Sequence, residues 1–233
     1  MTQNSRQRPL HRAPVSGGHM RGSKPEWQEF RVVGVTGISG SGTSTVAKIL
    51  EEQGGFIINA DKLAHAAQRK GGSAFTIIIK TFGEGILDEN GEINRRSLGA
   101  LVFGSENKEK LQILEQIIHP IVIAEIHTQI KDAANSGKYN FAVIDAPLLI
   151  ESGLNNLCNT CWLITAPHNL RLQRITARDG IDQETAERRL NSRPGDETLR
   201  PHADIVIEND GELETLCNRV LTALLEIGGR EPC

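Results

Sequence analysis

The sequence predicts an α/β fold in which helices cover both faces of a five-stranded parallel sheet. Short, uninterrupted apolar runs alternate with helical patterns, as is typical of parallel strands buried on both faces. With 233 residues, 38% of them hydrophobic, the chain can form one large domain with a substantial core. The expected strands cover residues 30–35, 56–58, 139–144, 160–165 and 204–207.

Helical patterns connect these strands. Residues 44–53 are expected to form a helix that ends at two glycines, and residues 212–227 an amphipathic closing helix. Between the second and third strands, residues 62–135 have a helical pattern, which we interpret as an insertion that covers the substrate. Two arginine-rich helices lie outside the alternation, and we interpret residues 167–200 as a mobile lid. Residues 25–233 therefore form one predicted domain.

Composition excludes several classes of function. The formal net charge is −3, which disfavours nucleic-acid partners, since these select a surplus of Lys and Arg. No apolar run reaches the roughly 20 residues that cross a bilayer, so no membrane role is expected. Cys158 and Cys161 form a C-x-x-C pair, a pattern found in redox-active sites and as half of a zinc site. We favour small structural residues before a strand, in a protein of the reducing cytoplasm.

Residues 1–24 differ from the rest of the chain. They hold five basic residues and no acid, which leaves 21 bases against 29 acids in the remainder. The segment has no apolar stretch, so it is not a secretory signal. A disordered tail or cloning remnant is the favoured interpretation, with an organelle transit peptide and a functional basic arm as alternatives.

A glycine-rich loop follows the first strand and opens a helix. It fits the phosphate-binding pattern G-x-x-x-x-G-K-[ST], except that Thr43 stands where lysine is expected. Its backbone N–H groups are expected to converge on phosphate oxygens, and the Ser44 hydroxyl to reach Mg²⁺. The alternative is a glycine-rich turn without a ligand. The predicted phosphate-binding residues are Gly37, Gly40, Ser41, Gly42, Thr43, Ser44 and Thr45.

Two acids follow strands at the sheet edge where ligands bind in open parallel sheets. Asp61 can accept a proton from a hydroxyl that attacks a γ-phosphate. The alternative for Asp61 is the N-cap of a helix that begins at Lys62. Asp145 ends a Walker-B-like apolar run and can hold a Mg²⁺-bound water.

Arginines are concentrated on the two helices of the predicted lid. Such a density suits the clamping of a transferring phosphate, although a solvated helix face is the commoner origin. The arginines in question are Arg174, Arg178, Arg188, Arg189 and Arg193.

Several segments of the chain occur together in one order and with one spacing. They are the phosphate loop, Asp61, His119-Pro120, and residues 147–153, 178–180 and 203–211. In this the chain resembles the dephospho-coenzyme A kinase family over about residues 31–225. The resemblance implies a P-loop kinase fold with a helical acceptor-binding insertion and a lid. It also implies ATP- and Mg²⁺-dependent phosphorylation of the ribose 3′-hydroxyl of dephospho-coenzyme A, by a monomer or a small homo-oligomer.

The resemblance also assigns roles to residues. Asp61 would be the catalytic base, and Arg178 and Arg189 would act from the lid. Asn209 would lie near the adenine. The acceptor side would be shaped by His119, Leu148, Leu149 and Glu151.

Three departures from the family pattern stand out, namely Asn59 for an acid, Arg193 for a glutamine, and Thr43 for the loop lysine. The lost lysine removes a charge from the phosphates, for which Arg193, or else Lys62, is the expected substitute. Two rival functions stay open at this point. One is a catalytically weak paralogue that senses nucleotide or coenzyme A, and the other is a kinase with a different acceptor.

Overall fold

The computed structural model describes residues 29–191 and 195–228, and it contains the predicted five-stranded parallel sheet. The strand order is β2-β3-β1-β4-β5, and every neighbouring pair is parallel. The predicted fold is thus confirmed, and residues 160–165 form a strand with the predicted bounds. The strands are β1 Arg31–Thr36, β2 Gly55–Asn59, β3 Phe141–Asp145, β4 Thr160–Thr165 and β5 Ile205–Glu208.

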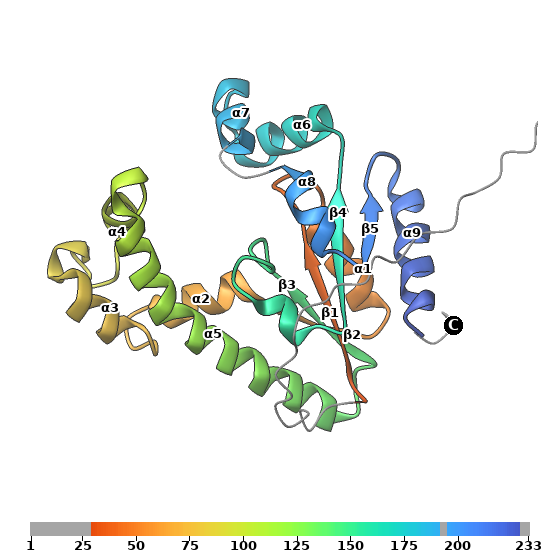
Figure 1. Ribbon diagram of the computed structural model, residues 1–233, viewed down its shortest axis with the longest axis horizontal. Coiled ribbons are helices and arrows are strands. Elements are labelled where there is room, and N and C mark those ends of the chain that lie inside the picture. Colours follow the sequence, from red (N-terminus) through yellow and green to blue (C-terminus); the bar gives the residue numbers. More distant parts are fainter. Residues whose placement is uncertain (1–28, 192–194, 229–233) are drawn as a thin grey trace, which may run out of the picture.

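Helices cover the two faces of the sheet separately (Figure 1). On one face, α1 (Thr43–Glu52) and α9 (Leu213–Glu226) enclose the larger core, which contains Val33, Val143 and Trp162 of the strands. On the other face, α5 (Lys108–Ser136) and the start of α2 (Ala60–Gln68) pack on Val32, Ala142 and Ile144. The strands alternate their side chains between these two cores, which explains their continuous apolar sequences.

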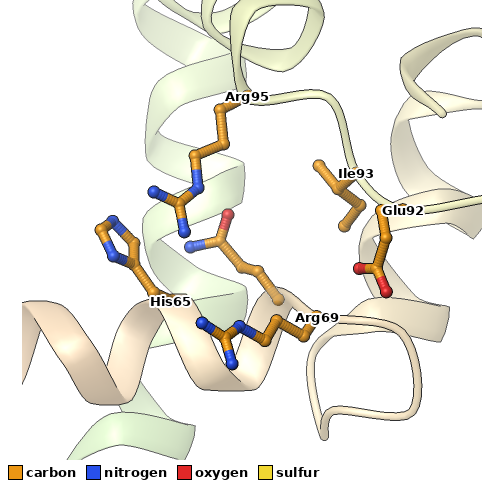
Figure 2. A pocket seen from close by; sticks show the side chains of 6 residues that line it. His65, Arg69, Glu92, Ile93 and Arg95 are labelled. Atoms are coloured by element: carbon orange, nitrogen blue, oxygen red, sulfur yellow. The ribbon is translucent and has the colours of Figure 1, made fainter. Parts of the chain in front are cut away.

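The predicted insertion forms a helical lobe beside the sheet (Figure 1). Its own core joins Ala67 and Ile78 to Leu98 and Leu114, so α5 contributes to this lobe and to the sheet core alike. Pro120 lies inside α5, near the boundary between these two packing regions. A pocket opens between α2 and the segment that enters α4 (Figure 2). The further elements of the lobe are α3 Phe75–Phe82, η1 Glu84–Ile86, α4 Arg95–Val102 and η2 Ser105–Asn107.

The predicted lid lies above the carboxyl ends of the strands. It is anchored by a small core in which Ile175, Ala186 and Leu190 pack against Leu163 of the sheet and Ile38 of the glycine-rich loop. Residues 192–194 of the predicted lid, which include Arg193, lie outside the described residues, as does the leader of residues 1–24. The described elements here are α6 His168–Asp179, α7 Gln183–Asn191, α8 Asp196–Leu199 and η4 Arg200–His202, and η3 Leu154–Leu157 lies before β4.

The helix after β2 begins differently from the prediction. Asn59, not Asp61, is the N-cap of α2, because the Asn59 side chain accepts a hydrogen bond from the backbone N–H of Lys62 at 2.9 Å. Asp61 instead lies in the first turn. Its carboxylate is therefore not used as the N-cap, where the second interpretation of Asp61 had placed it.

The cysteine pair lies at the start of β4. Cys161 is buried within that strand, and Cys158 just before it is partly buried. Across the described part of the chain, no group of three or more His, Cys, Asp or Glu side chains could hold a metal ion. In the same residues, no helix combines the length and apolar character needed to cross a membrane.

Candidate active site

A cleft of about 630 Å³ opens at the carboxyl ends of the strands, between the glycine-rich loop and the lid. It brings together the loop, the two predicted acids and three predicted lid arginines, although these are far apart in the sequence. Its lining residues are Gly37, Ile38, Ser39, Gly40, Gly42, Thr43, Ser44, Thr45, Asn59, Asp61, Asp145, Pro147, Arg174, Arg178 and Arg189.

The loop between β1 and α1 depends on its glycines. Gly40 and Gly42 adopt φ angles of 82° and 101°, which side-chain-bearing residues rarely adopt. A Cβ atom on Gly42 would lie 2.1 Å from Nδ2 of Asn209, and one on Gly40 would lie 2.8 Å from the carbonyl oxygen of Arg171. The loop is thus closely packed from behind, and it opens to the cleft on its other side.

A hydrogen-bonded pair holds this loop from behind. The buried Asn209, just after β5, donates from Nδ2 to the carbonyl oxygen of Ser41 at 2.7 Å. Arg174 of α6 donates to the carbonyl oxygen of Gly40 at 3.2 Å and to Oδ1 of Asn209 at 3.2 Å. The lid helix and the end of β5 therefore fix the loop jointly. The side-chain contacts of Asn209 are with this loop, and its predicted place near the adenine stays a prediction.

The two acids have different surroundings. Asp145 is buried, and its Oδ2 accepts a hydrogen bond of 2.9 Å from Nδ2 of Asn59. Burial, and to a lesser extent the Asp61 charge, raises the pKa of Asp145, which the Asn59 hydrogen bond partly offsets. Asp61 is exposed at the start of α2. Asp145 is thus a buried carboxylate held by Asn59, while the Asp61 side chain is exposed beside the cleft.

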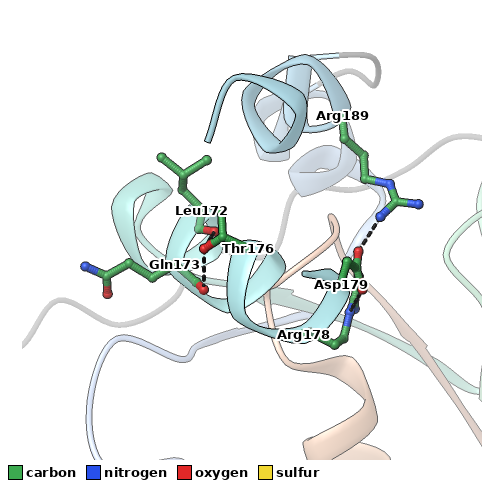
Figure 3. Close-up of polar contacts among 6 residues, drawn as sticks. All are labelled: Leu172, Gln173, Thr176, Arg178, Asp179 and Arg189. Atoms are coloured by element: carbon green, nitrogen blue, oxygen red, sulfur yellow. Dashed lines mark hydrogen bonds and ion pairs between the residues drawn. The ribbon is translucent and has the colours of Figure 1, made fainter. Parts of the chain in front are cut away.

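The lid arginines are linked through one carboxylate (Figure 3). Arg178 donates from Nε to Oδ1 of Asp179 at 2.7 Å and from Nη2 to Oδ2 at 3.0 Å. Arg189 of α7 donates to the same Oδ2. Asp179 therefore holds the arginines of both lid helices beside the cleft, and the hydrogen bond from Arg178 lowers the pKa of the Asp179 carboxyl.

A smaller, apolar pocket of about 110 Å³ adjoins this cleft. Ala60, Ile118, Val122 and Leu154 are among its lining residues, and Asp61 lines it as well as the cleft. Of the predicted acceptor-side residues, His119 and Leu148 line this pocket. Leu149 is instead fully buried in the sheet core, and Glu151 is exposed outside the pocket.

Three polar residues at the site were not assigned a role from the sequence. Asn59 appeared there as a departure from a pattern, whereas in the structure it caps α2 and binds Asp145. Arg174 appeared only as one of five lid arginines, although it contacts the loop. Asp179 appeared only as part of the segment 178–180 that supports the family resemblance, without a role of its own.

Solved structures give the class of the protein. A protein of Thermus thermophilus, TT1252, is 30% identical and superposes with a TM-score of 0.72, covering 85% of this chain and 98% of that one. The dephospho-CoA kinase from Campylobacter jejuni is 29% identical with a TM-score of 0.54, covering 84% and 97%. The parallel sheet, the glycine-rich loop and the lid define a P-loop kinase.

Sequence comparisons give the family. The model of the dephospho-CoA kinase family matches residues 31–215. The dephospho-CoA kinase of Carboxydothermus hydrogenoformans is 39% identical over 193 residues, which are 83% of this chain and 92% of the relative. That of Fusobacterium nucleatum is 40% identical over 189 residues, 81% and 94% of the two chains. This chain belongs to the dephospho-CoA kinase family, and the predicted resemblance and kinase activity are confirmed.

Proposed function

We propose that the site transfers the γ-phosphoryl group of ATP to the ribose 3′-hydroxyl of dephospho-coenzyme A, the last step of coenzyme A synthesis. One observation supports the assignment of an ATP side and an acceptor side to the site. Asp61 lines both the phosphate cleft and the apolar pocket, and it is thus at the boundary between a donor side and an acceptor side. A reacting hydroxyl at that boundary would be within reach of Asp61.

In this reaction the 3′-oxygen forms a bond to the γ-phosphorus, and the bond from that phosphorus to the β–γ bridging oxygen breaks. The bridging oxygen leaves on ADP with the electron pair. The hydroxyl proton passes to the carboxylate of Asp61. Because the transition state of phosphoryl transfer is loose, the base that accepts this proton needs little basicity. An exposed carboxylate is therefore sufficient.

The donor set fits Mg²⁺. Ser44 and the buried Asp145 both line the cleft and offer the hard oxygen atoms that this ion prefers. Because the held Asp145 carboxylate is desolvated, a divalent cation would favour its ionised form. Bound there, Mg²⁺ would neutralise charge on the phosphates. The hydrogen bond from Asn59 would keep the Asp145 carboxylate oriented towards it.

The charge normally supplied by the loop lysine needs another source in this chain. Three arginines line the cleft, and Arg174 is hydrogen-bonded to the loop itself. Lys62, one earlier candidate, is exposed and is not among the cleft-lining residues. We therefore assign the charge on the donor side to Arg174, Arg178 and Arg189, with Arg193 as a further candidate from the lid.

The test is a product assay with the full chain, ATP and Mg²⁺. We expect ADP and coenzyme A from dephospho-coenzyme A, detected by mass, and little product from nucleosides or small alcohols. Binding of nucleotide or coenzyme A without transfer to any acceptor would contradict the proposal and support a sensor. The free cysteines Cys158, Cys161 and Cys217 are consistent with a cytoplasmic enzyme, for which we propose a monomer or a small homo-oligomer.

A further inference from the structure

A second polar pocket lies in the helical lobe, away from the phosphate cleft. It has a volume of about 420 Å³ and lies between α2 and the segment that leads into α4. In Figure 2 the guanidinium groups of Arg69 and Arg95 turn towards the same side as the His65 ring, and Glu92 lies at the opposite end. We call it the basic pocket; its lining residues are His65, Gln68, Arg69, Glu92, Ile93 and Arg95.

The two arginines of the basic pocket, Arg69 and Arg95, have exposed side chains. Among the ion pairs of residues 29–191 and 195–228, none includes Arg69 or Arg95. Burial, then the Arg95 charge, lowers the pKa of His65, with a smaller contribution from Arg69, while Asp61 raises it. Three basic groups thus face one another in a setting that an anion would stabilise.

The position of Arg95 is unfavourable for the helix that bears it. Asn94 caps α4 by accepting hydrogen bonds from the backbone N–H groups of Arg96 and Ser97, so Arg95 is the first helical residue. A cation there lies at the positive end of the helix dipole, where acids are preferred and where the first turn of α4 has none. Helix stability therefore does not account for Arg95.

The chain segment that presents Arg95 is well ordered by its own contacts. Oδ1 of Asp88 accepts hydrogen bonds from the N–H groups of Asn90 and Glu92, at 2.9 and 3.0 Å. A β-bridge joins Leu87 to Ile93. The single carboxylate in the pocket, that of Glu92, accepts a hydrogen bond of 2.9 Å from the backbone N–H of Lys70. Glu92 is thus engaged at the far end of the pocket.

The helix α2 links the basic pocket to the reacting centre. His65 lies one turn beyond Asp61, about 6 Å along the helix axis, and Arg69 one turn further. The 3′-hydroxyl and the 5′-diphosphate of a nucleotide lie on opposite sides of a single sugar ring. An acceptor with its 3′-hydroxyl at Asp61 and its diphosphate along α2 would therefore bring that diphosphate to the basic pocket.

We propose that Arg69 and Arg95, with His65, bind the 5′-diphosphate of the acceptor. This rests on the proposed function, since it takes the acceptor to be a nucleoside diphosphate ester that reacts at Asp61. The pocket then selects acceptors by their diphosphate, separately from the donor phosphates in the cleft. Guanidinium groups suit this role because they form paired, charge-assisted hydrogen bonds to phosphate oxygens.

The test measures binding by calorimetry without ATP, followed by steady-state kinetics. We expect Arg95→Gln and Arg69→Gln each to raise the Kd of dephospho-coenzyme A about 10- to 100-fold, the loss typical of a charged hydrogen bond. The KM of ATP should change less than twofold. The matched control is Arg96→Gln, which removes the same charge from the next residue of α4 and is outside the pocket lining; it should change the Kd less than twofold.

Adenosine, which lacks the diphosphate, separates recognition from a general defect. The variants should bind adenosine as the unmodified protein does, while Arg95→Lys should recover part of the lost affinity for dephospho-coenzyme A. Equal effects of Arg95→Gln and Arg96→Gln would overturn the proposal. So would an equal loss of affinity for adenosine and for dephospho-coenzyme A.

Failure of the proposed function would give a different pattern. A chain that binds dephospho-coenzyme A through Arg69 and Arg95 but forms no product would retain the basic pocket and lose the kinase assignment. A chain that forms product, with both arginine variants unaffected in Kd and KM, would retain the assignment and lose the basic pocket.

Discussion

The two groups of arginines differ in how the protein holds them. On the lid, Arg178 and Arg189 share the carboxylate of Asp179, which fixes both guanidinium groups beside the phosphate cleft. In the basic pocket, Arg69 and Arg95 line one cavity, and neither appears among the ion pairs of the described residues. The lid pair is thus pre-positioned by a carboxylate, whereas the pocket pair is exposed and has no ion-pair partner among the described residues.

This difference has a functional meaning. Arginines that a carboxylate already holds in place need little reorganisation during a reaction. They are therefore suited to stabilising charge that develops in the transition state. Cations without a protein partner gain most from binding in the ground state, so they suit recognition of a substrate. We expect the lid arginines to affect kcat and the pocket arginines to affect the acceptor Kd.

The largest effect is expected from Asp61, which belongs to neither group of arginines. Asp61→Asn removes the proposed base at the boundary between donor and acceptor sides, and it should lower kcat 10²–10⁴-fold. The Kd values of ATP and dephospho-coenzyme A, measured by calorimetry, should stay within about threefold. A variant that keeps more than about a third of the original rate would leave Asp61 with only a structural role in the first turn of α2.

The lid arginines come next. Arg178→Ala and Arg189→Ala should each lower kcat by about 10- to 100-fold, the range expected for loss of one charged hydrogen bond in the transition state. The KM of ATP should rise far less. Steady-state kinetics with varied ATP tests this. The matched control is Arg188→Ala, because Arg188 lies next to Arg189 on α7 but outside the cleft lining. An equal change in kcat and KM would indicate ground-state binding instead.

Asp179 tests whether pre-positioning matters. Asp179→Asn keeps the size of the side chain and removes the charge that both lid arginines share, so we expect a two- to fivefold fall in kcat, as befits an exposed ion pair. Combined with Arg189→Ala, the substitution should add less than its separate effect, because the partner is already gone. Full additivity in this double-mutant cycle would mean that Asp179 acts independently of Arg189.

The smallest effect concerns His65 in the basic pocket. Its pKa is lowered by burial, by Arg95 and by Arg69, and it is raised by Asp61; Glu92 also lines this pocket. An anion that neutralises the arginines would raise this pKa, so binding of dephospho-coenzyme A near pH 6.5 should take up a fraction of a proton. Calorimetry in buffers of different ionisation enthalpy measures the uptake. His65→Gln should abolish it, and an unchanged uptake in that variant would assign the proton to another group.

The sequence predicted the sheet well because its strands carry their own signal. Residues 160–165 are apolar throughout, and β4 has those bounds. The cap of α2 was predicted wrongly, because Asn59 and Asp61 are both good capping residues and only the structure distinguishes them.

The parts of the site that escaped prediction depend on contacts across long stretches of chain. Asn209 binds the carbonyl of Ser41, 168 positions away, and no local pattern marks such a pair. The basic pocket joins α2 to the start of α4, and its arginines resemble those of any solvated helix face when read in sequence. Asp179 binds the neighbouring Arg178, but its second partner, Arg189, lies on another helix.

Pro120 has a mechanical consequence for the helical lobe. Proline has no N–H, so the carbonyl of Gln116 loses its usual i+4 donor within α5, and the helix is weakened there against bending. Before this point α5 packs through Leu114 in the lobe, and after it through Val122 and Ile126 on the sheet. His119, in the apolar pocket, precedes the weak point directly. The 29-residue helix therefore has its weakest point beside the apolar pocket, so a small bend at residue 120 would widen or narrow that pocket while the sheet stays rigid.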